Sequence, residues 1–337
     1  MASTAKRFTY IAIIAAVMAL LAASYFRRGA QSVTFSRALM GTLVQITIME
    51  EDGGEAASEA AAEAAFDEIS RLEKILSSYD PASDVSLVSK AAGAASVKVS
   101  PEVVEVVAKA MEISNLSAGA FDPTVGALAR AWGYSGEKGE VPPADEVARL
   151  LPLVDYRAIV VDEKNSTVML SKKGMVLNLG GVAKGFIVGK AIAKLKAGGM
   201  RRGIVHAGGD MTVFQTGEGE SFTVGIQHPR EKKLLGEIHV ANGAVATSGD
   251  YERFFMKDGI RYHHILDPKT GFPARRSQSA TVTSIDPTQA DALSTAAFVM
   301  GPVAGMEMIE KLEGVEGAMV GADGRVFTSS GFKGRIF

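Results

Sequence analysis

The sequence of 337 residues contains no cysteine. This absence excludes zinc–thiolate sites, a cysteine nucleophile, a disulfide framework and a lipid-modified cysteine, and it suits export to an oxidising compartment. The chain also lacks a strong excess of either charge, since 36 Lys and Arg stand against 38 Asp and Glu. Because the four charges within residues 1–30 are all positive, the remainder is more acidic than basic. We therefore expect no nucleic-acid partner.

The composition provides ample material for a folded core. Hydrophobic residues make up 47% of the chain, which contains 36 Gly and 11 Pro without a repeating pattern. These proportions exclude disordered and collagen-like classes. At about 150 residues per domain, the length allows one large or two modest domains.

The amino-terminal region contains the only long apolar segment. Residues 8–26 carry no charge, and at 1.5 Å per residue they would extend about 28 Å, close to the roughly 30 Å hydrocarbon core of a membrane. A single transmembrane anchor is one interpretation. A cleaved signal peptide is the other, because Ala22-Ala23-Ser24 offers small residues for cleavage. We expect residues 1–30 to form this segment and residues 31–337 to form the exported domain.

The remaining pattern predicts an α+β fold, a compact mixed arrangement of sheet and helix with a helical flank. A turn at residues 40–42 joins two extended segments within residues 33–49, and a long amphipathic helix follows. The later chain alternates short β-rich segments with helices. The predicted strands are residues 159–161, 167–170, 176–179, 203–205, 222–226, 244–247, 261–266 and 280–285. The predicted helices are residues 55–76, 101–111, 182–195, 287–300 and 303–312, with a loose linker at 133–145.

A glycine-rich segment at residues 178–185 ends one predicted strand and begins a helix, with Lys184 in the first helical turn. Glycines let a ligand approach the backbone, and the free N–H groups of a helix start attract phosphate. The spacing matches neither a Walker loop nor a dinucleotide motif, so an ordinary strand–helix turn remains the alternative. A second glycine turn at residues 206–210 is interpreted as a hairpin.

Asp291 is the only ionisable residue between positions 290 and 301, in a helix that is otherwise apolar or uncharged. Burying an unpaired carboxylate there would be costly, so we expect a compensating group. Thr295 lies one turn later on the same helix face. Oxygen ligands of this kind suit Mg²⁺ better than Zn²⁺. The alternative is a solvated carboxylate favoured by the helix dipole.

Two adjacent histidines, His263 and His264, precede a Pro/Gly turn. On a strand they would face opposite sides, so at most one would point into a site. Residues 247–253 place hydroxyl groups beside another glycine turn and resemble a polar rim. No nucleophile elbow or Ser-His-Asp order is present.

Together these motifs resemble the FAD:protein FMN transferases, the ApbE-like flavin transferases, whose fold is related to the T-fold. The resemblance covers about residues 36–330. Its blocks, in chain order, are Met-Gly-Thr at 40–42, Ser-Tyr at 78–79 with Asp-Val-Ser at 84–86, Phe-Asp-Pro-Thr at 121–124 with Trp-Gly-Tyr at 132–134, Leu-Gly-Gly-x-Ala-Lys-Gly at 179–185, Ala-Gly-Gly-Asp at 207–210, Thr-Ser-Gly-Asp-Tyr-Glu-Arg at 247–253, His-Ile-Leu-Asp-Pro-x-Thr-Gly at 264–271 and Ala-Asp-Ala-Leu-Ser-Thr-Ala at 290–296.

The resemblance implies particular site residues. Magnesium ligands would be Asp291, Thr295 and the backbone carbonyl of Gly181. The FAD pocket would be lined by Met40, Tyr79, Ala120, Phe121, Asp122, Asn178, Lys184 and Ile265. One departure is Asn178, where the family commonly has Asp, because an amide keeps the shape of the side chain but removes its charge. The family's frequent amino-terminal lipobox cysteine is also absent.

The implied reaction moves FMN from FAD to a Thr or Ser hydroxyl of a partner flavoprotein, such as a membrane redox-complex subunit, and releases AMP. His264 is the expected proton acceptor, since an ordinary histidine titrates near neutral pH, and Asp250 is a weaker candidate. Two alternatives remain open, namely a magnesium-dependent FAD pyrophosphatase and a non-catalytic flavin-binding module. The expected location is the bacterial inner membrane with a periplasmic domain, or the periplasm if the amino-terminal segment is cleaved.

Overall fold

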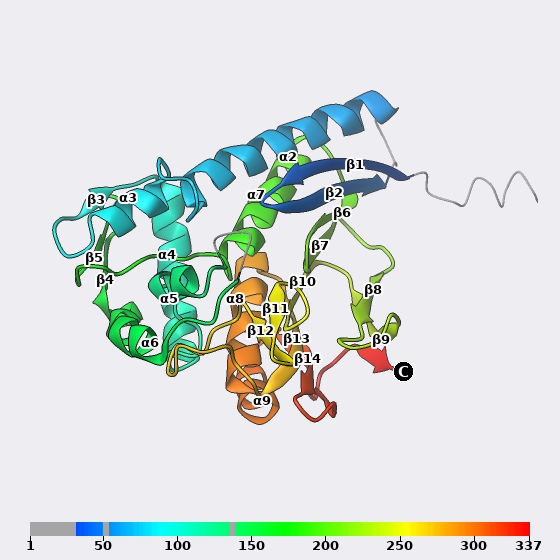
Figure 1. Cartoon of the computed structure of the whole chain (residues 1–337). Coiled ribbons are helices and arrows are strands. Elements are labelled where there is room, and N and C mark those ends of the chain that lie inside the picture. Colours follow the sequence, from blue (N-terminus) through cyan, green and yellow to red (C-terminus); the bar gives the residue numbers. More distant parts are fainter. Residues whose placement is uncertain (1–31, 50–53, 135–138) are drawn as a thin grey trace, which may run out of the picture.

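The computed structural model describes residues 32–49, 54–134 and 139–337 (Figure 1). The predicted membrane or signal segment at residues 8–26 lies outside these ranges. Among the residues described, no helix is both long enough and apolar enough to cross a membrane.

An eight-stranded sheet in the order β1-β2-β6-β7-β10-β13-β14-β15 organises the fold, and every neighbouring pair is antiparallel. Its strands are β1 (Ser32–Leu39), β2 (Thr42–Met49), β6 (Arg202–Ala207), β7 (Asp210–Gln215), β10 (Gly243–Gly249), β13 (Ser277–Ser284), β14 (Glu316–Gly321) and β15 (Val326–Thr328). The turn between β1 and β2 places Met40 and Gly41 at positive φ. Tight turns between antiparallel strands favour such conformations.

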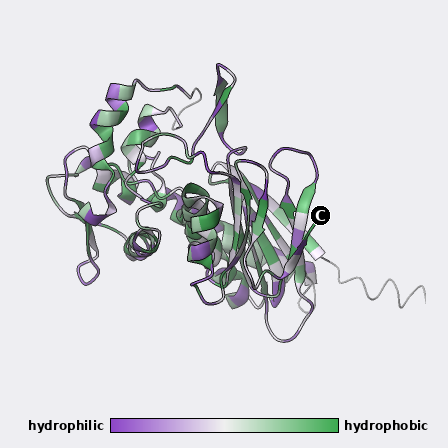
Figure 2. Ribbon diagram, turned by 90° about the horizontal axis from the view of Figure 1, so that it is seen from below, coloured by the Kyte–Doolittle hydropathy of each residue, from purple (hydrophilic) through white to green (hydrophobic). Residues whose placement is uncertain are grey.

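Helices cover one face of this sheet (Figures 1 and 2). They are α2 (Gly54–Leu76), α7 (Ala183–Ala197), α8 (Pro287–Met300) and α9 (Pro302–Ile309). α2 packs on α7 and β1, while α8 lies over β10 and β13 and contacts both α7 and α9. Apolar side chains at helical spacing, such as Phe66, Ile69 and Leu72 of α2, are fully buried in the core between these layers.

A smaller antiparallel sheet covers part of the other face. It consists of β8 (Phe222–Gln227), β9 (Leu234–Val240) and β16 (Gly334–Ile336) in the order β16-β9-β8. Alternate side chains of β8 face inward, as the exposed and buried positions alternate along the strand. A second apolar cluster joins β8 and β9 to Val213, Val245 and Val320 of the main sheet. The main sheet therefore has an apolar layer on each face.

A helical flank lies beside these layers (Figure 1). It contains α3 (Asp84–Lys90), α4 (Pro101–Leu116), α5 (Gly126–Ala131), α6 (Ala144–Leu150), the 3₁₀ turns η1 (Leu151–Leu153) and η2 (Tyr156–Ala158), and a sheet of β3 (Val97–Lys98), β5 (Thr167–Leu170) and β4 (Ile159–Asp162). Pro101 begins α4 directly after the N-cap Ser100.

A short hairpin of β11 (Phe254–Lys257) and β12 (Ile260–His263) pairs separately from the larger sheets. It contributes to a satellite cluster around Trp132, whose indole ring lies 5.6 Å from the rings of both Tyr262 and Phe272. Trp132 Nε1 donates a hydrogen bond of 2.8 Å to the carbonyl of Gly271. The turn after His264 is thereby fastened to α5 and its surroundings.

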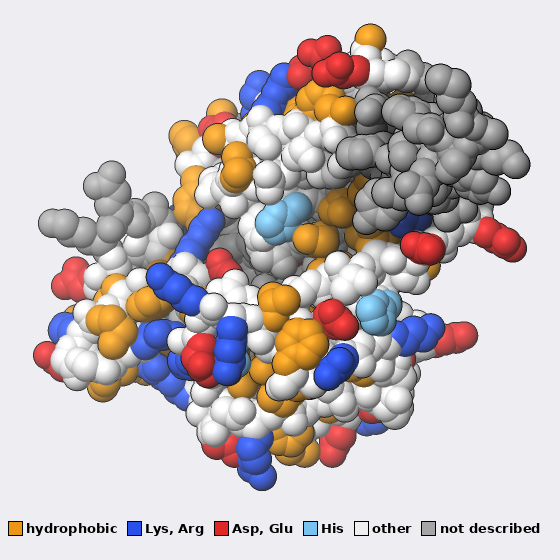
Figure 3. All heavy atoms as spheres, turned by 90° about the vertical axis from the view of Figure 1, so that its right-hand side faces the viewer, with side chains coloured by type: hydrophobic (Ala, Val, Ile, Leu, Met, Phe, Trp, Pro, Cys, Tyr) orange, Lys and Arg blue, Asp and Glu red, His pale blue; other side chains and the backbone are white. Residues whose placement is uncertain are grey.

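The surface mixes charges of both signs. On the face shown in Figure 3, Lys and Arg side chains are interspersed with Asp and Glu side chains. This distribution follows the near balance of charges in the sequence.

The α+β class is confirmed, as are the hairpin at residues 33–49 and the long helix that follows. The predicted strand at residues 176–179 is wrong. Only Val176 forms a bridge, to Val125, and the next residues lead into α7 without a ladder. Val176, Leu177 and Leu179 are nevertheless buried, so hydrophobicity alone did not distinguish the segment from a strand. The predicted linker at 133–145 overlaps the start of α6.

Candidate functional site

The start of α7 crosses the start of α8 at very short range. A Cβ atom on Gly185 would lie 2.1 Å from the carbonyl oxygen of Pro287 and 2.8 Å from Cβ of Asp291. The absence of a side chain at this glycine therefore permits the crossing. Gly185 N donates a hydrogen bond of 2.9 Å to Asp291 Oδ2, which fixes the carboxylate against α7.

Asp291 is buried, with 4% of its surface exposed, so the interpretation as a solvated helix-start carboxylate is wrong. Burial and the nearby Asp210 carboxylate raise the pKa of Asp291 above its usual value. The Lys184 ammonium opposes this effect. Lys184 forms an ion pair with Asp210, itself buried at the start of β7. Burial disfavours the charge on Lys184, but Asp210 and Asp291 together raise its pKa above the ordinary value.

Thr295 completes the pair that the sequence predicts on this helix. The hydroxyl oxygen of Ser248 in β10 lies 3.1 Å from Thr295 Oγ1. A Cβ on Gly181 would lie 3.1 Å from the same Oγ1 and 3.2 Å from the ring of Phe121. The backbone of Gly181 thus approaches both Thr295 and Phe121, and Asp291 lies one turn away on α8.

The chemical types of these groups suit the binding of a hard cation. A buried carboxylate, a hydroxyl and the main chain of a glycine converge, and two carboxylates face the single ammonium of Lys184. Oxygen donors with few carboxylates suit Mg²⁺. No group of three or more His, Asp or Glu side chains with metal-binding geometry occurs in the described part of the chain. A cation at this site would therefore be bound by the Asp291 carboxylate, the Thr295 hydroxyl and the main chain of Gly181.

The two histidines separate in the way that strand geometry predicts, although β12 ends at His263. Both ring nitrogens of His263 make hydrogen bonds. Its Nε2 donates to the carbonyl of Ala274 at 2.7 Å, and its Nδ1 accepts from Ile265 N at 3.3 Å. Burial lowers the pKa of His263 to about 4. His263 is therefore a structural histidine.

Nε2 of the His264 ring makes no hydrogen bond within residues 32–49, 54–134 and 139–337. Its Nδ1 lies 3.3 Å from the carbonyl oxygen of Arg253. Because a carbonyl only accepts, Nδ1 carries the proton and Nε2 keeps its lone pair. Burial and the Arg253 guanidinium lower the pKa of His264 to about 3, and Lys184 contributes to this shift. His264 is consequently neutral at pH 7 and lies within electrostatic reach of the Lys184 group.

Arg253 links this histidine to the first hairpin. A Cβ on Gly41 would lie 3.7 Å from the Arg253 guanidinium. Met40, which precedes that glycine, is partly buried and packs against the main core. The turn after β1 thus reaches the same region as His264, although more than 200 residues separate them in the sequence.

Asp250 is held by two arginines. Its carboxylate accepts two hydrogen bonds of 2.7 Å from Arg230 and one of 3.1 Å from Arg261. Both oxygens of the Asp250 carboxylate are therefore occupied by guanidinium donors, whereas Nε2 of His264 has no hydrogen-bond partner among the described residues.

Asp122 and Asn178 both accept hydrogen bonds from main-chain N–H groups. Asp122 Oδ1 accepts from both the backbone and the hydroxyl of Thr124, and Oδ2 accepts from Tyr156 N at 3.0 Å. Burial raises the pKa of Asp122 despite these bonds. Asn178 Oδ1 accepts from Gly180 N at 2.9 Å, so the amide retains an acceptor that shapes the glycine turn.

The remaining predicted FAD-pocket residues differ in exposure. Ala120 and Ile265 are buried in the main core, with 6% of each residue exposed. Tyr79, between α2 and α3, has 58% of its surface exposed. The structure therefore brings Lys184, Gly181, Asp291 and Thr295 together and leaves Tyr79 at the surface.

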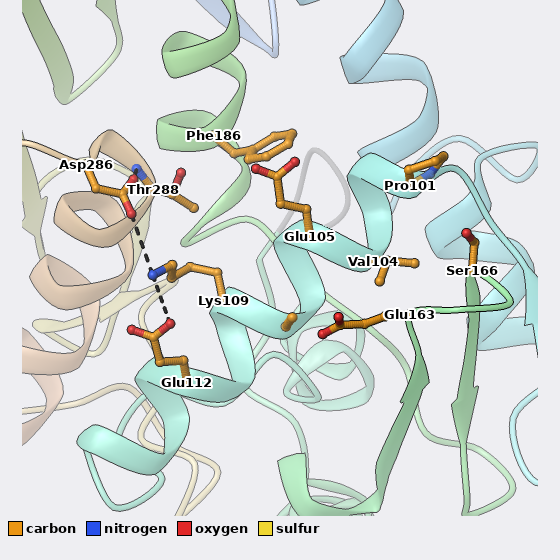
Figure 4. Close-up of a pocket in the computed structure, with 11 residues that line it drawn as sticks. Pro101, Val104, Glu105, Lys109, Glu112, Glu163, Ser166, Phe186, Asp286 and Thr288 are labelled. Atoms are coloured by element: carbon orange, nitrogen blue, oxygen red, sulfur yellow. Dashed lines mark hydrogen bonds and ion pairs between the residues drawn. The ribbon is translucent and has the colours of Figure 1, made fainter.

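A separate hollow of about 660 Å³ lies between α4, α7 and the start of α8 (Figure 4). Glu105, Lys109 and Glu163 line it, and Lys109 forms ion pairs with Glu112 and Asp286. None of its lining residues is a predicted site residue. It lies outside the group around Lys184.

Asp210, Ser248 and Arg253 contact or influence the site, although none of them is among the site residues predicted from the sequence. All three lie within motif blocks that the sequence shows, Ala-Gly-Gly-Asp and Thr-Ser-Gly-Asp-Tyr-Glu-Arg. Their acidic, hydroxyl and basic side chains directly beside glycine turns were the available signal.

Comparison with known proteins agrees with these motifs. The model of the ApbE family matches residues 40–319. A FAD:protein FMN transferase of Treponema pallidum is 32% identical over 90% of this chain and 88% of its own length. A FAD:protein FMN transferase of Klebsiella pneumoniae is 30% identical over 88% of this chain and 92% of its own length. These names confirm the expectation of a transferase.

Solved structures give the same result. The ApbE protein of Thermotoga maritima superposes with a TM-score of 0.83 at 34% identity, covering 89% of this chain and 97% of its own. The flavin transferase ApbE from Vibrio cholerae superposes with a TM-score of 0.79 at 26% identity, covering 90% of this chain and 99% of its own. The resemblance predicted from the motifs is thus confirmed, and this chain belongs to the ApbE family.

Proposed function

We propose that this protein transfers FMN from FAD to a Thr or Ser hydroxyl of a partner flavoprotein and releases AMP, with Mg²⁺ as cofactor. The observation that carries the proposal is the convergence of Lys184, Asp291 and Thr295 at a glycine turn, within electrostatic reach of a neutral histidine. The names of the relatives support the choice of FAD as donor and a protein as acceptor.

Asp291, Thr295 and the carbonyl of Gly181 would hold Mg²⁺. When bound, the ion supplies positive charge that offsets the charge of the FAD pyrophosphate. Lys184 adds an ammonium, and the backbone N–H groups of the glycine turn add donors. Lys184 is prepared for this role because Asp210 keeps it charged and limits its motion.

In the transfer step, the acceptor hydroxyl oxygen forms a bond to the phosphorus of the FMN half. The pyrophosphate P–O bond breaks, and AMP leaves with that bridging oxygen. His264 accepts the hydroxyl proton at Nε2. This nitrogen carries the lone pair because Nδ1 holds the ring proton against the Arg253 carbonyl. In the FAD pocket, we propose that Met40, Tyr79, Ala120, Phe121, Asp122, Asn178 and Ile265 join Lys184 as lining residues.

The test combines purified protein, FAD, Mg²⁺ and a candidate acceptor flavoprotein, and measures the acceptor's mass. We expect the acceptor to gain one FMN in the presence of Mg²⁺ and none after chelation. His264→Gln should abolish the gain, whereas His239→Gln, on β9 beside Thr223, should not. FMN released without acceptor labelling would instead indicate a pyrophosphatase, and retention of intact FAD would indicate a binding module.

We further propose that the domain is held at the outer face of a bacterial inner membrane. This proposal rests on the uncharged sequence of residues 8–26. Fractionation of cells that express the full chain tests it. Recovery of a shortened protein in the soluble periplasmic fraction would favour cleavage of that segment.

A further inference from the structure

A recess of about 320 Å³ lies beside the β11–β12 hairpin and contains an unusual concentration of guanidinium groups. Arg230, Arg261 and Arg275 line it, while Asp250 is the only carboxylate among its lining residues. The recess therefore has a net positive lining. This differs from the mixed charges on the face shown in Figure 3.

The arginines are held in place by their own contacts. Asp250 accepts from Arg230 and Arg261, and the Arg261 guanidinium also lies 4.3 Å from the centre of the Phe254 ring. Arg275 donates through Nη1 to the carbonyl of Arg261 and lies over the ring of Tyr262. Nη2 of Arg261 and Nη2 of Arg275 make no hydrogen bond within the described ranges. Two preorganised guanidinium groups thus keep donors available.

Ser277 provides a second, independent observation. Ser277 is one of the lining residues, it is 4% exposed, and its Oγ has no hydrogen-bond partner among the described residues. A buried hydroxyl without a partner is unfavourable, because its hydrogen bonds to water are lost and not replaced. An acceptor oxygen in the recess would supply the missing bond.

We propose that this recess binds one oxyanion, a carboxylate or a phosphate, through Arg261, Arg275 and the Ser277 hydroxyl. Guanidinium groups match the geometry of such oxyanions, and the hydroxyl adds a neutral donor. Asp250 orients Arg261 and leaves the lining positively charged. His263 lines this recess, whereas Lys184, Asp291 and Thr295 are not among its lining residues, so an oxyanion here is bound separately from the proposed FAD phosphates.

Titration of the full-length protein with inorganic phosphate, at constant ionic strength maintained with chloride, tests the site. We expect a saturable rise in melting temperature. Arg275→Gln should weaken the apparent phosphate affinity about tenfold, as expected for loss of a charge-assisted hydrogen bond. Arg325→Gln, at an exposed ion pair with Asp323, is the matched control and should leave the affinity unchanged.

Ser277→Ala separates binding from folding. Without phosphate, this variant should melt at the same temperature as the parent or higher, because the unpartnered hydroxyl is gone. With phosphate, its melting temperature should rise less. A phosphate response that persists unchanged in both Arg275→Gln and Ser277→Ala would overturn the proposal, since binding would then lie elsewhere.

The oxyanion has two sources that share this chemistry, a free anion and an acidic side chain of the acceptor polypeptide. This second arm rests on the proposed function, whereas the phosphate titration does not. If the acceptor supplies the carboxylate, Arg275→Gln should raise the KM for acceptor several-fold without changing FAD affinity, and phosphate should compete with the acceptor. An unchanged KM, together with phosphate binding, assigns the site to a free anion.

Discussion

Adding one methyl group at Gly185 tests how the site is assembled. The new Cβ would lie 2.1 Å from the Pro287 carbonyl oxygen and 2.8 Å from Asp291 Cβ. Because normal contacts are about 3.5 Å, α7 and the start of α8 would have to separate by roughly 1 Å. Overpacking of this kind costs about 1–3 kcal/mol, and the better helix propensity of Ala returns about 1 kcal/mol.

Gly189 provides the matched control one turn later in α7. Its Cβ would lie 3.6 Å from Pro287 Cγ, an ordinary contact. Gly189→Ala should therefore gain about 1 kcal/mol from helix propensity and melt about 2–4 °C higher. Gly185→Ala should melt several degrees below the parent, because the steric cost exceeds the propensity gain.

The two variants should differ in activity as well. The displacement caused by Gly185→Ala moves Asp291, which is bound to the Gly185 N–H at 2.9 Å. A misplacement of 1 Å in a catalytic arrangement can cost about 100-fold in rate, so we expect a transfer rate lower by about that factor. Acceptor flavinylation by Gly189→Ala should be normal. Equal stability and equal activity of the two variants would refute the steric reasoning.

Three further predictions follow from the same geometry. Asp291→Asn should abolish transfer at ordinary Mg²⁺ concentrations, whereas Asp286→Asn, at the N-cap of the same helix, should change stability by about 1 kcal/mol or less and retain transfer in the flavinylation assay. Because the pKa of His264 is about 3 in the folded protein, its imidazole stays neutral from pH 8 to pH 5, and the pH–rate profile should show no loss from its protonation in that range. Lys184→Gln leaves Asp210 buried without its ion pair, so denaturant titration should show a loss of about 1–3 kcal/mol at pH 7.

Local signals in the sequence predicted several elements because the determining residues are adjacent. The N-cap Asp286 with Pro287 gives the start of α8, and its side chain accepts from Thr288 N as capping predicts. The alternating pattern of β2 gives its buried face. By contrast, three of the four side chains at 176–179 are apolar and buried without strand pairing, and a buried strand would show the same pattern.

Prediction of the site was limited by long-range contacts. Asp291 was recognisable because an isolated carboxylate in an apolar helix needs compensation. Its neighbour Asp210 lies about 80 residues away in the chain, and only the sheet and helix packing brings the two together. The ion pairs that occupy Asp250 likewise depend on Arg230, which comes from the connection between β8 and β9. Periodicity and spacing carry no signal for such contacts.

Trp132 also gives the molecule a built-in optical reporter. It is the only tryptophan in the chain, it is fully buried, and its indole N–H holds the turn at Gly271 that follows His264. Indole emission depends on the polarity around the ring, so intrinsic fluorescence reads the state of this satellite cluster, while far-UV circular dichroism reads the sheets and helices as a whole. Opening of the turn that follows His264 can therefore be detected without any label, separately from global unfolding.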